Sequence, residues 1–350
     1  MNVFELTYDQ LVDEFQHRYG KGAYHAAAVY REGFRGEGQG IESLPELQQS
    51  PALARRITAD LAAYHPMVSA EKTEGELTKF VTRLGDGLEI ESVVIPMYKR
   101  LTVCVSSQVG CRMGCTFCET AQLGLQRNLT VAEIVGQVIT ARKRFGREVR
   151  NVVFMGMGEP FDNFENLIQA IRVLSDQRGL DIAPRYITVS TVGRVDGIRK
   201  LAAANLPNLN LAVSLNASND DIRSRIMPVN LAMPMATLRE ALMDFPLKPS
   251  AALFIEYVLI KGVNDSRKHA KELADYLRPL PAKLNLIGYN PRTDSPFVPP
   301  EEEDIYRFRD WLIEEKVFVR LRSPKGRSVM AACGQLGNRE LKGKKPIVAG

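Results

Sequence analysis

The sequence predicts an α/β fold, in which a parallel sheet curls into an open or partial barrel that follows a small helical N-terminal domain. Three observations predict it. From residue 101 onward, short apolar runs alternate with longer amphipathic segments. Before residue 85, the segments have helical periodicity with Gly and Pro breaks between them. The 350-residue chain is 45% hydrophobic and 25% charged, which is the composition of a globular protein with a sizeable core.

Residues 1–85 are expected to form a helical accessory domain. Apolar residues recur at helical spacing in FELTYDQLVDEFQHRYG (4–20), YHAAAVYREGFRG (24–36) and LARRITADLAAYH (53–65). The next stretch, EGELTKFVTRLGDGLEIESVVIP (74–96), contains a Gly-Asp-Gly turn and predicts a β-hairpin. We expect this hairpin to link the helical domain to the barrel by about residue 100.

Residues 101–336 are expected to form the barrel, and 337–350 a basic tail. The apolar runs predicted to be strands are LTVCVSS (101–107), NVVFMGMG (151–158), YITVSTV (186–192), LNLAVSL (209–215), LFIEYVLI (253–260), LNLIGYN (284–290) and VFVRLRS (317–323). Their alternation with helical segments indicates parallel strands, and about six such units make a partial barrel. Sites in such folds gather at the carboxyl ends of the strands.

Four of the five cysteines lie between residues 104 and 118, and the first predicted strand of the barrel leads directly into them. Cys111, Cys115 and Cys118 have the spacing C-x3-C-x2-C. Three thiolates on one loop can bind three irons of a cube-shaped cluster and leave the fourth iron open, and thiolate ligation suits iron–sulfur chemistry.

Two other metal sites are alternatives to this interpretation. Structural zinc normally takes four protein ligands, but the sequence offers no second cysteine pair, and its four histidines do not cluster. An electron-transfer ferredoxin needs a fourth nearby cysteine. Cys104 is a poor candidate because it sits inside an apolar strand-like run.

Composition and charge allow RNA as a partner without requiring it. The formal net charge is +5 and the isoelectric point is near 8.9, which fits an RNA-binding protein or a solvated basic surface equally well. No apolar run reaches the roughly 18 residues of a membrane span, and the N-terminus does not resemble a secretory signal. We therefore expect a cytoplasmic protein without membrane contact, and a monomer.

The cysteine triad, with Phe117 before its last member, resembles the signature of the radical S-adenosylmethionine (SAM) superfamily. A wider set of motifs resembles the RlmN/Cfr group of radical SAM RNA methyltransferases. These motifs are CVSSQVGCRMGCTFCETAQLGLQRNLTVAEIVGQV, NVVFMGMGEP, ITVSTVG, GVND, NLIGYNP and AACGQL, in this order along the chain. The resemblance runs from about Glu89 to Leu336.

This resemblance implies a fold, a reaction and cofactors. The fold is a partial (βα)6 radical SAM barrel with a small N-terminal domain, and the cofactors are a [4Fe–4S] cluster and SAM. The activity is methylation of an adenine ring carbon in RNA, at C2 and less often at C8, through a methyl-cysteine intermediate. The substrate is ribosomal or transfer RNA, and a flavodoxin or ferredoxin donates one electron.

The resemblance also implies roles for individual residues. Cys333 in AACGQL carries the methyl group, Cys104 resolves the intermediate through a transient disulfide, and Glu91 aligns with a proton acceptor. Without the resemblance, Cys104 and Cys333 would be interpreted as inert core thiols, and Glu91 as a solvated strand residue. The implied SAM contacts are Gly158, Glu159, Ser190, Ser214, Leu215, Asn216 and Asn290. Taken alone, these SAM contacts would be ordinary strand ends and turns.

Two basic runs are candidates for phosphate contacts, one at Arg142, Lys143, Arg144, Arg147 and Arg150, the other at Arg320, Arg322, Lys325 and Arg327. Two departures from the group's motifs bear on the substrate. Asn216 replaces the histidine of the usual SLHAP, and Arg327, Ser328 and Met330 replace residues of an acidic run before Cys333. The sequence therefore leaves the target nucleotide open.

Three hypotheses follow from the sequence. The first is RNA adenine methylation. The second is a radical SAM enzyme that acts on a small molecule or peptide instead of RNA. The third is an iron–sulfur or RNA-binding protein without enzymatic activity.

Overall fold

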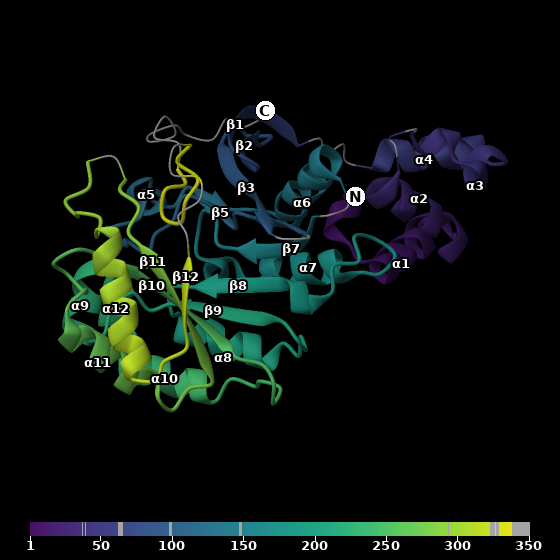
Figure 1. Ribbon diagram of the computed structural model, residues 1–350. Coiled ribbons are helices and arrows are strands. Elements are labelled where there is room, and N and C mark those ends of the chain that lie inside the picture. The colour runs from purple at the N-terminus through teal and green to yellow at the C-terminus, as the bar shows by residue number, and fades with distance from the viewer. Residues whose placement is uncertain are drawn as a thin grey trace.

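The structure is a computed structural model. It describes residues 1–36, 38, 40–61, 66–97, 100–146, 149–292, 294–322, 326 and 329–337. In this part of the chain, one ten-stranded sheet runs in the order β1-β2-β3-β4-β7-β8-β9-β10-β11-β12, with helices packed on its outer side (Figure 1). None of the helices described is long and apolar enough to cross a membrane.

The parallel part of the sheet begins at β4 and continues to β12. Its strands are β4 (Arg100–Cys104), β7 (Val149–Phe154), β8 (Ile187–Thr191), β9 (Asn210–Ser214), β10 (Leu253–Leu259), β11 (Ala282–Gly288) and β12 (Val319–Arg322). Each strand pairs in parallel with its neighbour in this order. Every predicted barrel strand is therefore confirmed, and so is the α/β class. The short seventh strand, β12, extends the six-unit barrel.

Helices connect these strands on the outside of the sheet. They are α6 (Val131–Phe145), α7 (Phe164–Ser175), α8 (Val195–Ala203), α9 (Asp220–Ile226), α10 (Met235–Met243), α11 (Arg267–Leu277) and α12 (Glu302–Glu314). A capping box of Thr130 and Glu133 starts α6, which comes after the cysteine loop (111–118) and the short helix that follows it. Short 3₁₀ turns also occur at η1 (Val3–Glu5), η2 (Ile41–Ser43), η3 (Pro160–Asn163), η4 (Pro184–Tyr186) and η5 (Pro228–Leu231).

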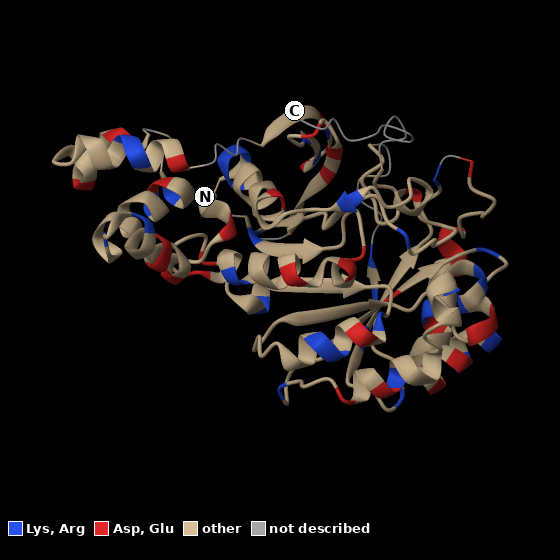
Figure 2. Cartoon of the chain, turned by 180° about the vertical axis from the view of Figure 1, so that it is seen from behind, with Lys and Arg blue, Asp and Glu red and all other residues tan. Residues whose placement is uncertain are grey.

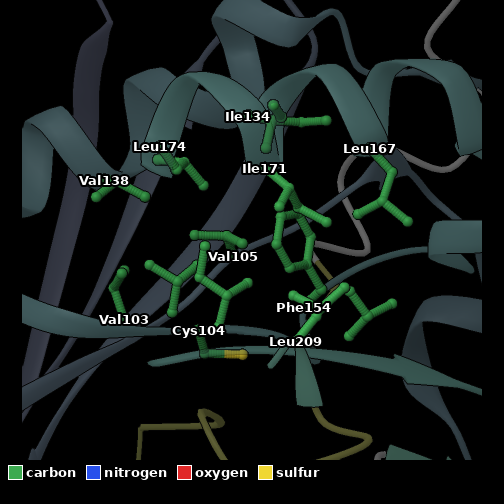
Figure 3. Packing of buried hydrophobic residues seen from close by; sticks show 14 of the residues in the cluster. Val103, Cys104, Val105, Ile134, Val138, Phe154, Leu167, Ile171, Leu174 and Leu209 are labelled. Carbon is green, nitrogen blue, oxygen red and sulfur yellow. The ribbon is translucent and has the colours of Figure 1, made fainter. Parts of the chain in front are cut away.

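The core lies between the sheet and these helices (Figure 3). Ile134 and Ile171 project from α6 and α7 onto the sheet, where they meet residues such as Val105, and all three are fully or almost fully buried. Side chains alternate across a strand, so the Cys104 sulfur points to the opposite side of β4 from its neighbour Val105. One face of β4 thus builds the core, and the other faces the inside of the barrel.

The N-terminal helices pack on one side of the barrel. They are α1 (Tyr8–Tyr19), α2 (Ala23–Arg35), α3 (Pro45–Gln48) and α4 (Pro51–Asp60). The Tyr8 amide donates to Asp176 Oδ2 at 2.6 Å, and Arg35 Nε donates to the Gly179 carbonyl at 2.7 Å. Both acceptors follow α7, so the helical segment is attached to the end of the sheet where α7 ends.

The helical segment is shorter than predicted. The described helices end at Asp60, and the chain then forms the antiparallel strands β1 (Met67–Glu74), β2 (Leu77–Arg83) and β3 (Glu89–Met97). The hairpin of β2 and β3 is the one the sequence predicts. The sequence gives no sign of β1 because it is an exposed edge strand, so its side chains have no apolar alternation. We call β1–β3 the meander; β3 joins it to β4.

A fully buried arginine holds the carboxyl ends of two parallel strands in place. Arg223 of α9 is 0% exposed. Its guanidinium donates to the carbonyls of Leu215 and Val192, which follow β9 and β8, and to Asn230 Oδ1 at 2.9 Å. A buried carbonyl without a donor costs free energy, so this one side chain satisfies three acceptors that would otherwise be unpaired.

We predict that Arg223→Met lowers the free energy of unfolding by about 3 kcal/mol, since it leaves these buried acceptors without donors. Urea denaturation followed by circular dichroism measures the change. Arg225→Met, on the exposed face of the same helix, is the matched control and should shift the free energy of unfolding by less than about 0.5 kcal/mol. Equal stability of the two variants would contradict the prediction.

Candidate active site

A cavity opens at the carboxyl ends of the parallel strands, where the fold class predicts a site. It encloses about 930 Å³ of empty space, part of it open to solvent. Its walls come from three regions: the cysteine loop, the ends of β7 to β11, and the segment 329–337, which we call the Cys333 segment. The predicted site residues that line it are Cys115, Cys118, Gly158, Glu159, Ser190, Ser214, Asn216 and Cys333.

The cysteine loop is held in place by backbone hydrogen bonds. The Cys111 amide donates to the Gly124 carbonyl at 3.1 Å, and the Thr116 amide donates to the Ile226 carbonyl at 3.0 Å. Cys111 and Cys115 are buried and Cys118 is half-buried. The short helix α5 (Glu119–Gln122) follows Cys118 directly. The loop therefore presents its thiols from a defined backbone, with Cys115 and Cys118 in the cavity wall and Cys111 buried outside it.

This donor set fits an iron–sulfur cluster. In the described residues, no three His, Cys, Asp or Glu side chains converge on one point to bind a single metal ion. A cube-shaped cluster does not need such convergence because each thiolate binds a different iron. Burial raises the pKa of all three thiols, that of Cys111 to about 12, so cluster binding has to displace their protons.

A buried carboxylate ties the cysteine loop to the loop after β7. Asp162, whose side chain is 1% exposed, accepts from Arg112 Nε at 2.6 Å and is also paired with Arg194. Arg112 lies next to Cys111, and Arg194 precedes α8. Because charge-assisted hydrogen bonds are stronger than neutral ones, this bridge fixes the cysteine loop relative to two barrel strands.

Gly158 and Glu159 place a carboxylate in the cavity wall. Gly158 has φ of +105°, and a Cβ there would lie 2.7 Å from Gln108 Cβ, so only glycine fits. Glu159 is 1% exposed and accepts from the amides of Phe161 at 3.1 Å and Val192 at 2.9 Å. Burial raises the pKa of Glu159 to about 7 despite these bonds. The carboxyl is therefore suited to a cationic ligand.

The remaining predicted SAM contacts fall into two groups. Ser190, Ser214 and Asn216 line the cavity at the ends of β8 and β9. Asn216 has φ of +56°, a region that asparagine tolerates, and its Oδ1 accepts from the Val258 amide at 2.9 Å. Leu215 and Asn290 are buried and are not among the residues that line the cavity.

Cys333 reaches the cavity from the other end of the sequence. It is exposed, and its exposed surface opens into the cavity, whose walls surround it. Burial by these walls raises the pKa of its thiol to about 11. The Glu119 amide donates to the Gly334 carbonyl at 2.7 Å, and Thr120 Oγ1 donates to the Leu336 carbonyl at 2.5 Å. The Cys333 segment is therefore attached directly to α5.

Cys104 is buried at the end of β4 and does not line the cavity. Burial raises the pKa of its thiol, and negative charge on Cys333 raises it further. The two sulfurs are thus near enough for one charge to act on the other. All five cysteines are free in the structure, so the predicted disulfide, which is transient, remains a prediction.

Glu91 lies outside the cavity wall, in β3. Its Oε1 is 3.3 Å from Lys79 Nζ, and its Oε2 accepts from the Gly337 amide at 2.9 Å. The side chains of Glu91 and Lys79 are 6% and 8% exposed. Both carboxylate oxygens of Glu91 therefore have donors within the protein. The proton-acceptor role that the resemblance implies for Glu91 stays a prediction.

The sequence analysis missed Glu256, a second carboxyl in the cavity wall. Glu256 lies in β10, is 8% exposed, and accepts from Asn285 Nδ2 at 2.7 Å. Burial raises its pKa, and the positive charge of Arg322 lowers it. One signal was available, because an acidic residue interrupts the apolar strand run LFIEYVLI. A charge inside a buried strand often marks a functional site.

The two basic runs have different surroundings. In the first, Arg142 donates to the carbonyls of Val149, at the amino end of β7, and of Leu180, and Arg144 pairs with Glu71 of β1. In the second, Arg320 and Arg322 are exposed on β12. Arg147, Lys325, Arg327 and Ser328 lie outside the described residues, as does the predicted tail from 338 onward. Figure 2 shows acidic and basic residues mixed along the helices.

Comparisons with known proteins agree with this arrangement. Residues 105–275 match the family model described as the radical SAM superfamily. The chain is 43% identical over 349 residues to a probable dual-specificity RNA methyltransferase RlmN 1 of Protochlamydia amoebophila, covering 99% of this chain and 97% of that protein. The chain belongs to the RlmN family of radical SAM methyltransferases. Its cofactors are accordingly a [4Fe–4S] cluster and SAM.

Other RlmN relatives extend along nearly the whole chain. The dual-specificity RNA methyltransferase RlmN of Nitratidesulfovibrio vulgaris is 39% identical and covers 97% of this chain and 95% of its own length. A crystal structure of a radical SAM methyltransferase from Sphaerobacter thermophilus superposes with a TM-score of 0.89 at 38% identity, covering 96% of this chain and 99% of that one. The similarity to RlmN proteins therefore includes the N-terminal helices and the meander.

We predict that iodoacetamide modifies Cys333 at least about tenfold faster than Cys104, because Cys333 opens into the cavity and Cys104 is buried. The experiment uses cluster-loaded protein, in which the other three thiols are protected, and peptide mass spectrometry first verifies that Cys333 is unmodified. Equal rates at the two cysteines would contradict the structure's placement of them.

Proposed function

We propose that this RlmN family member methylates a ring carbon, C2, of an adenine in RNA, with Cys333 as the methyl carrier. The observation that carries the proposal is that Cys333 opens into the cavity that Cys115 and Cys118 also line. A cysteine from the far end of the chain that is exposed inside a cavity adds little to the core, so its place there favours a chemical role. The names of the relatives support RNA as the substrate.

The residues in and around the cavity would bind the two cofactors. Cys111, Cys115 and Cys118 would bind the cluster, and the Glu159 carboxylate would bind the ammonium group of SAM. Ser190, Ser214 and Asn216, with the neighbouring Leu215 and Asn290, would border the rest of SAM. When bound, the two cofactors supply the methyl group and the radical that an unreactive amidine carbon requires.

Cys333 and Cys104 would then act in sequence. The Cys333 thiol would lose its proton and accept the methyl group. After that group has lost one hydrogen atom to the radical, the remaining CH2 would join the Cys333 sulfur to the adenine carbon, which would give up its own hydrogen as a proton while one electron returns to the cofactors. The Cys104 thiolate would then attack the Cys333 sulfur, so that an S–S bond forms, the S–C bond breaks, and the released carbon takes up a proton to give the methylated base. A dithiol reductant restores both thiols. The effect of charge on Cys333 on the pKa of the Cys104 thiol supports this pairing.

The adenine has to leave its stack to reach this cavity, as a base must in enzymes that modify it. Arg320 and Arg322, exposed on β12, are available to bind phosphates near the entrance. We expect the protein to act as a monomer. A small electron carrier such as flavodoxin or ferredoxin would provide the electron, and ribosomal or transfer RNA in the cytoplasm would be the substrate.

We predict that RNA from a strain lacking this protein has lost one methyladenosine, measured by mass spectrometry of nuclease digests of ribosomal and transfer RNA. Complementation with the wild type restores the nucleoside, and complementation with Cys333→Ala does not. Wild-type levels of every methyladenosine in the deletion strain would contradict RNA as the substrate and favour another acceptor.

We also predict that SAM binds more tightly as the pH rises. The pKa of Glu159 is raised to about 7, so its carboxyl is protonated below this pH and ionised above it. The ionised form attracts the ammonium group, so affinity should increase by up to about tenfold from pH 6 to pH 8. Equilibrium dialysis under anaerobic conditions measures it. Glu159→Gln should bind weakly with a flat pH profile, and a wild-type profile that falls with pH would refute the assignment.

A further inference from the structure

A buried ion pair lies behind the active site, in the meander. Lys79 of β2 and Glu91 of β3 approach to 3.3 Å, with side chains 8% and 6% exposed. Desolvating two charges costs about as much as their attraction returns, so a buried pair is weak evidence for a contribution to stability. A gain in stability therefore does not explain why the pair is buried. The other hydrogen bonds of Lys79 and Glu91 suggest a different role.

Both members of the pair bind the Cys333 segment. Lys79 Nζ donates to the Met330 carbonyl at 3.0 Å, and Glu91 Oε2 accepts from the Gly337 amide at 2.9 Å. These two contacts lie on either side of Cys333 along the chain. Glu74, at the end of β1, adds a contact shortly before the segment by accepting from the Gly326 amide at 2.8 Å. The meander is thus a platform for the segment that carries the reactive thiol.

We propose that Lys79 and Glu91 are positioning residues that fix Cys333 in the cavity, and that Glu91 acts through the Gly337 amide instead of accepting a proton from substrate. The proposal rests on the proposed function, in which Cys333 carries the methyl group. It assigns a role to Lys79 and replaces the proton-acceptor role that the sequence suggests for Glu91.

The geometry supports positioning over proton transfer. A general base has to lie within hydrogen-bond reach of the proton that it removes. Glu91 is not among the residues that line the cavity, and both of its carboxylate oxygens already have donors in the protein. Its backbone carbonyl accepts from Ser106 Oγ at 2.7 Å, which fixes β3 beside the end of β4. The carboxylate is thus held firmly and directed at the Cys333 segment.

The two sides of the segment are held independently. On the cavity side, α5 binds Gly334 and Leu336 through Glu119 and Thr120. On the far side, the Lys79–Glu91 pair binds Met330 and Gly337. Loss of the pair should therefore displace Cys333 while the cysteine loop, and with it the cluster, stays in place. Displacement of a reacting atom by about 1 Å is enough to slow a reaction severalfold to a hundredfold.

The test compares Lys79→Met, Glu91→Ala and Glu91→Gln in the full-length, cluster-loaded protein. Methylation of Cys333 by SAM is followed by peptide mass spectrometry, and iron content and reductive SAM cleavage to 5′-deoxyadenosine are measured in parallel. Lys79→Met and Glu91→Ala should slow methylation by about tenfold or more, with iron content and SAM cleavage near wild type. Glu91→Gln should stay within about threefold, because its amide oxygen still accepts from Gly337.

Two further variants separate the effect of the pair from general effects of mutation and from poor folding. Arg83→Met is the matched control, since Arg83 pairs with Glu89 across the same two strands at 3.1 Å and its guanidinium donates to that carboxylate, outside the Cys333 segment. It should methylate Cys333 at the wild-type rate. The double variant Lys79→Met/Glu91→Leu replaces the pair by apolar residues, a change that stability usually tolerates. It should still be slow, even if a single variant folds poorly.

Specific outcomes overturn the proposal. If Glu91→Gln forms methyl-Cys333 at the wild-type rate but no longer methylates RNA, while Lys79→Met is normal in both steps, Glu91 accepts a proton from the substrate. If all variants methylate Cys333 at the wild-type rate, the pair does not position the segment. Absence of methyl-Cys333 in the wild type would instead refute the proposed function, so the two failures can be told apart.

Discussion

The two hydrogen bonds between α5 and the Cys333 segment hold the active site together. They join the Glu119 amide to Gly334 and the Thr120 hydroxyl to Leu336, residues more than two hundred positions apart. Because Glu119 directly follows Cys118, these two bonds attach the Cys333 segment to the end of the cysteine loop. The barrel alone would place the cysteine loop at the strand ends, and this contact, together with those of the meander, brings the last cysteine to the same cavity.

The cavity also has a consistent electrostatic character. Burial raises the pKa values of its thiols and of the carboxyls of Glu159 and Glu256, so the empty site favours their neutral forms. Iron ions and a sulfonium are positively charged, and their binding offsets this cost. The same burial that disfavours charge in the empty site strengthens attraction to these cations once water is displaced.

Much of the barrel could be predicted because its signals are local. Each parallel strand is a short apolar run, and the triad of Cys111, Cys115 and Cys118 has a distinctive spacing. The missed features depend on long-range contacts. Strand β1 is an exposed edge strand with no apolar alternation. The role of Lys79 depends on its hydrogen bond to the Met330 carbonyl, a residue near the other end of the chain. Nothing near Glu91 in the sequence indicates that Gly337 will bind it.

Amide hydrogen exchange in the anaerobic, cluster-loaded protein tests the central claim most directly, namely that the cysteine loop and the Cys333 segment form one unit. The account predicts slow exchange at the amides of Glu119 and Gly337, which donate across the two sides of the segment. It also predicts that Thr120→Val speeds exchange at Glu119. Exchange at both amides as fast as in an unstructured peptide would contradict the account.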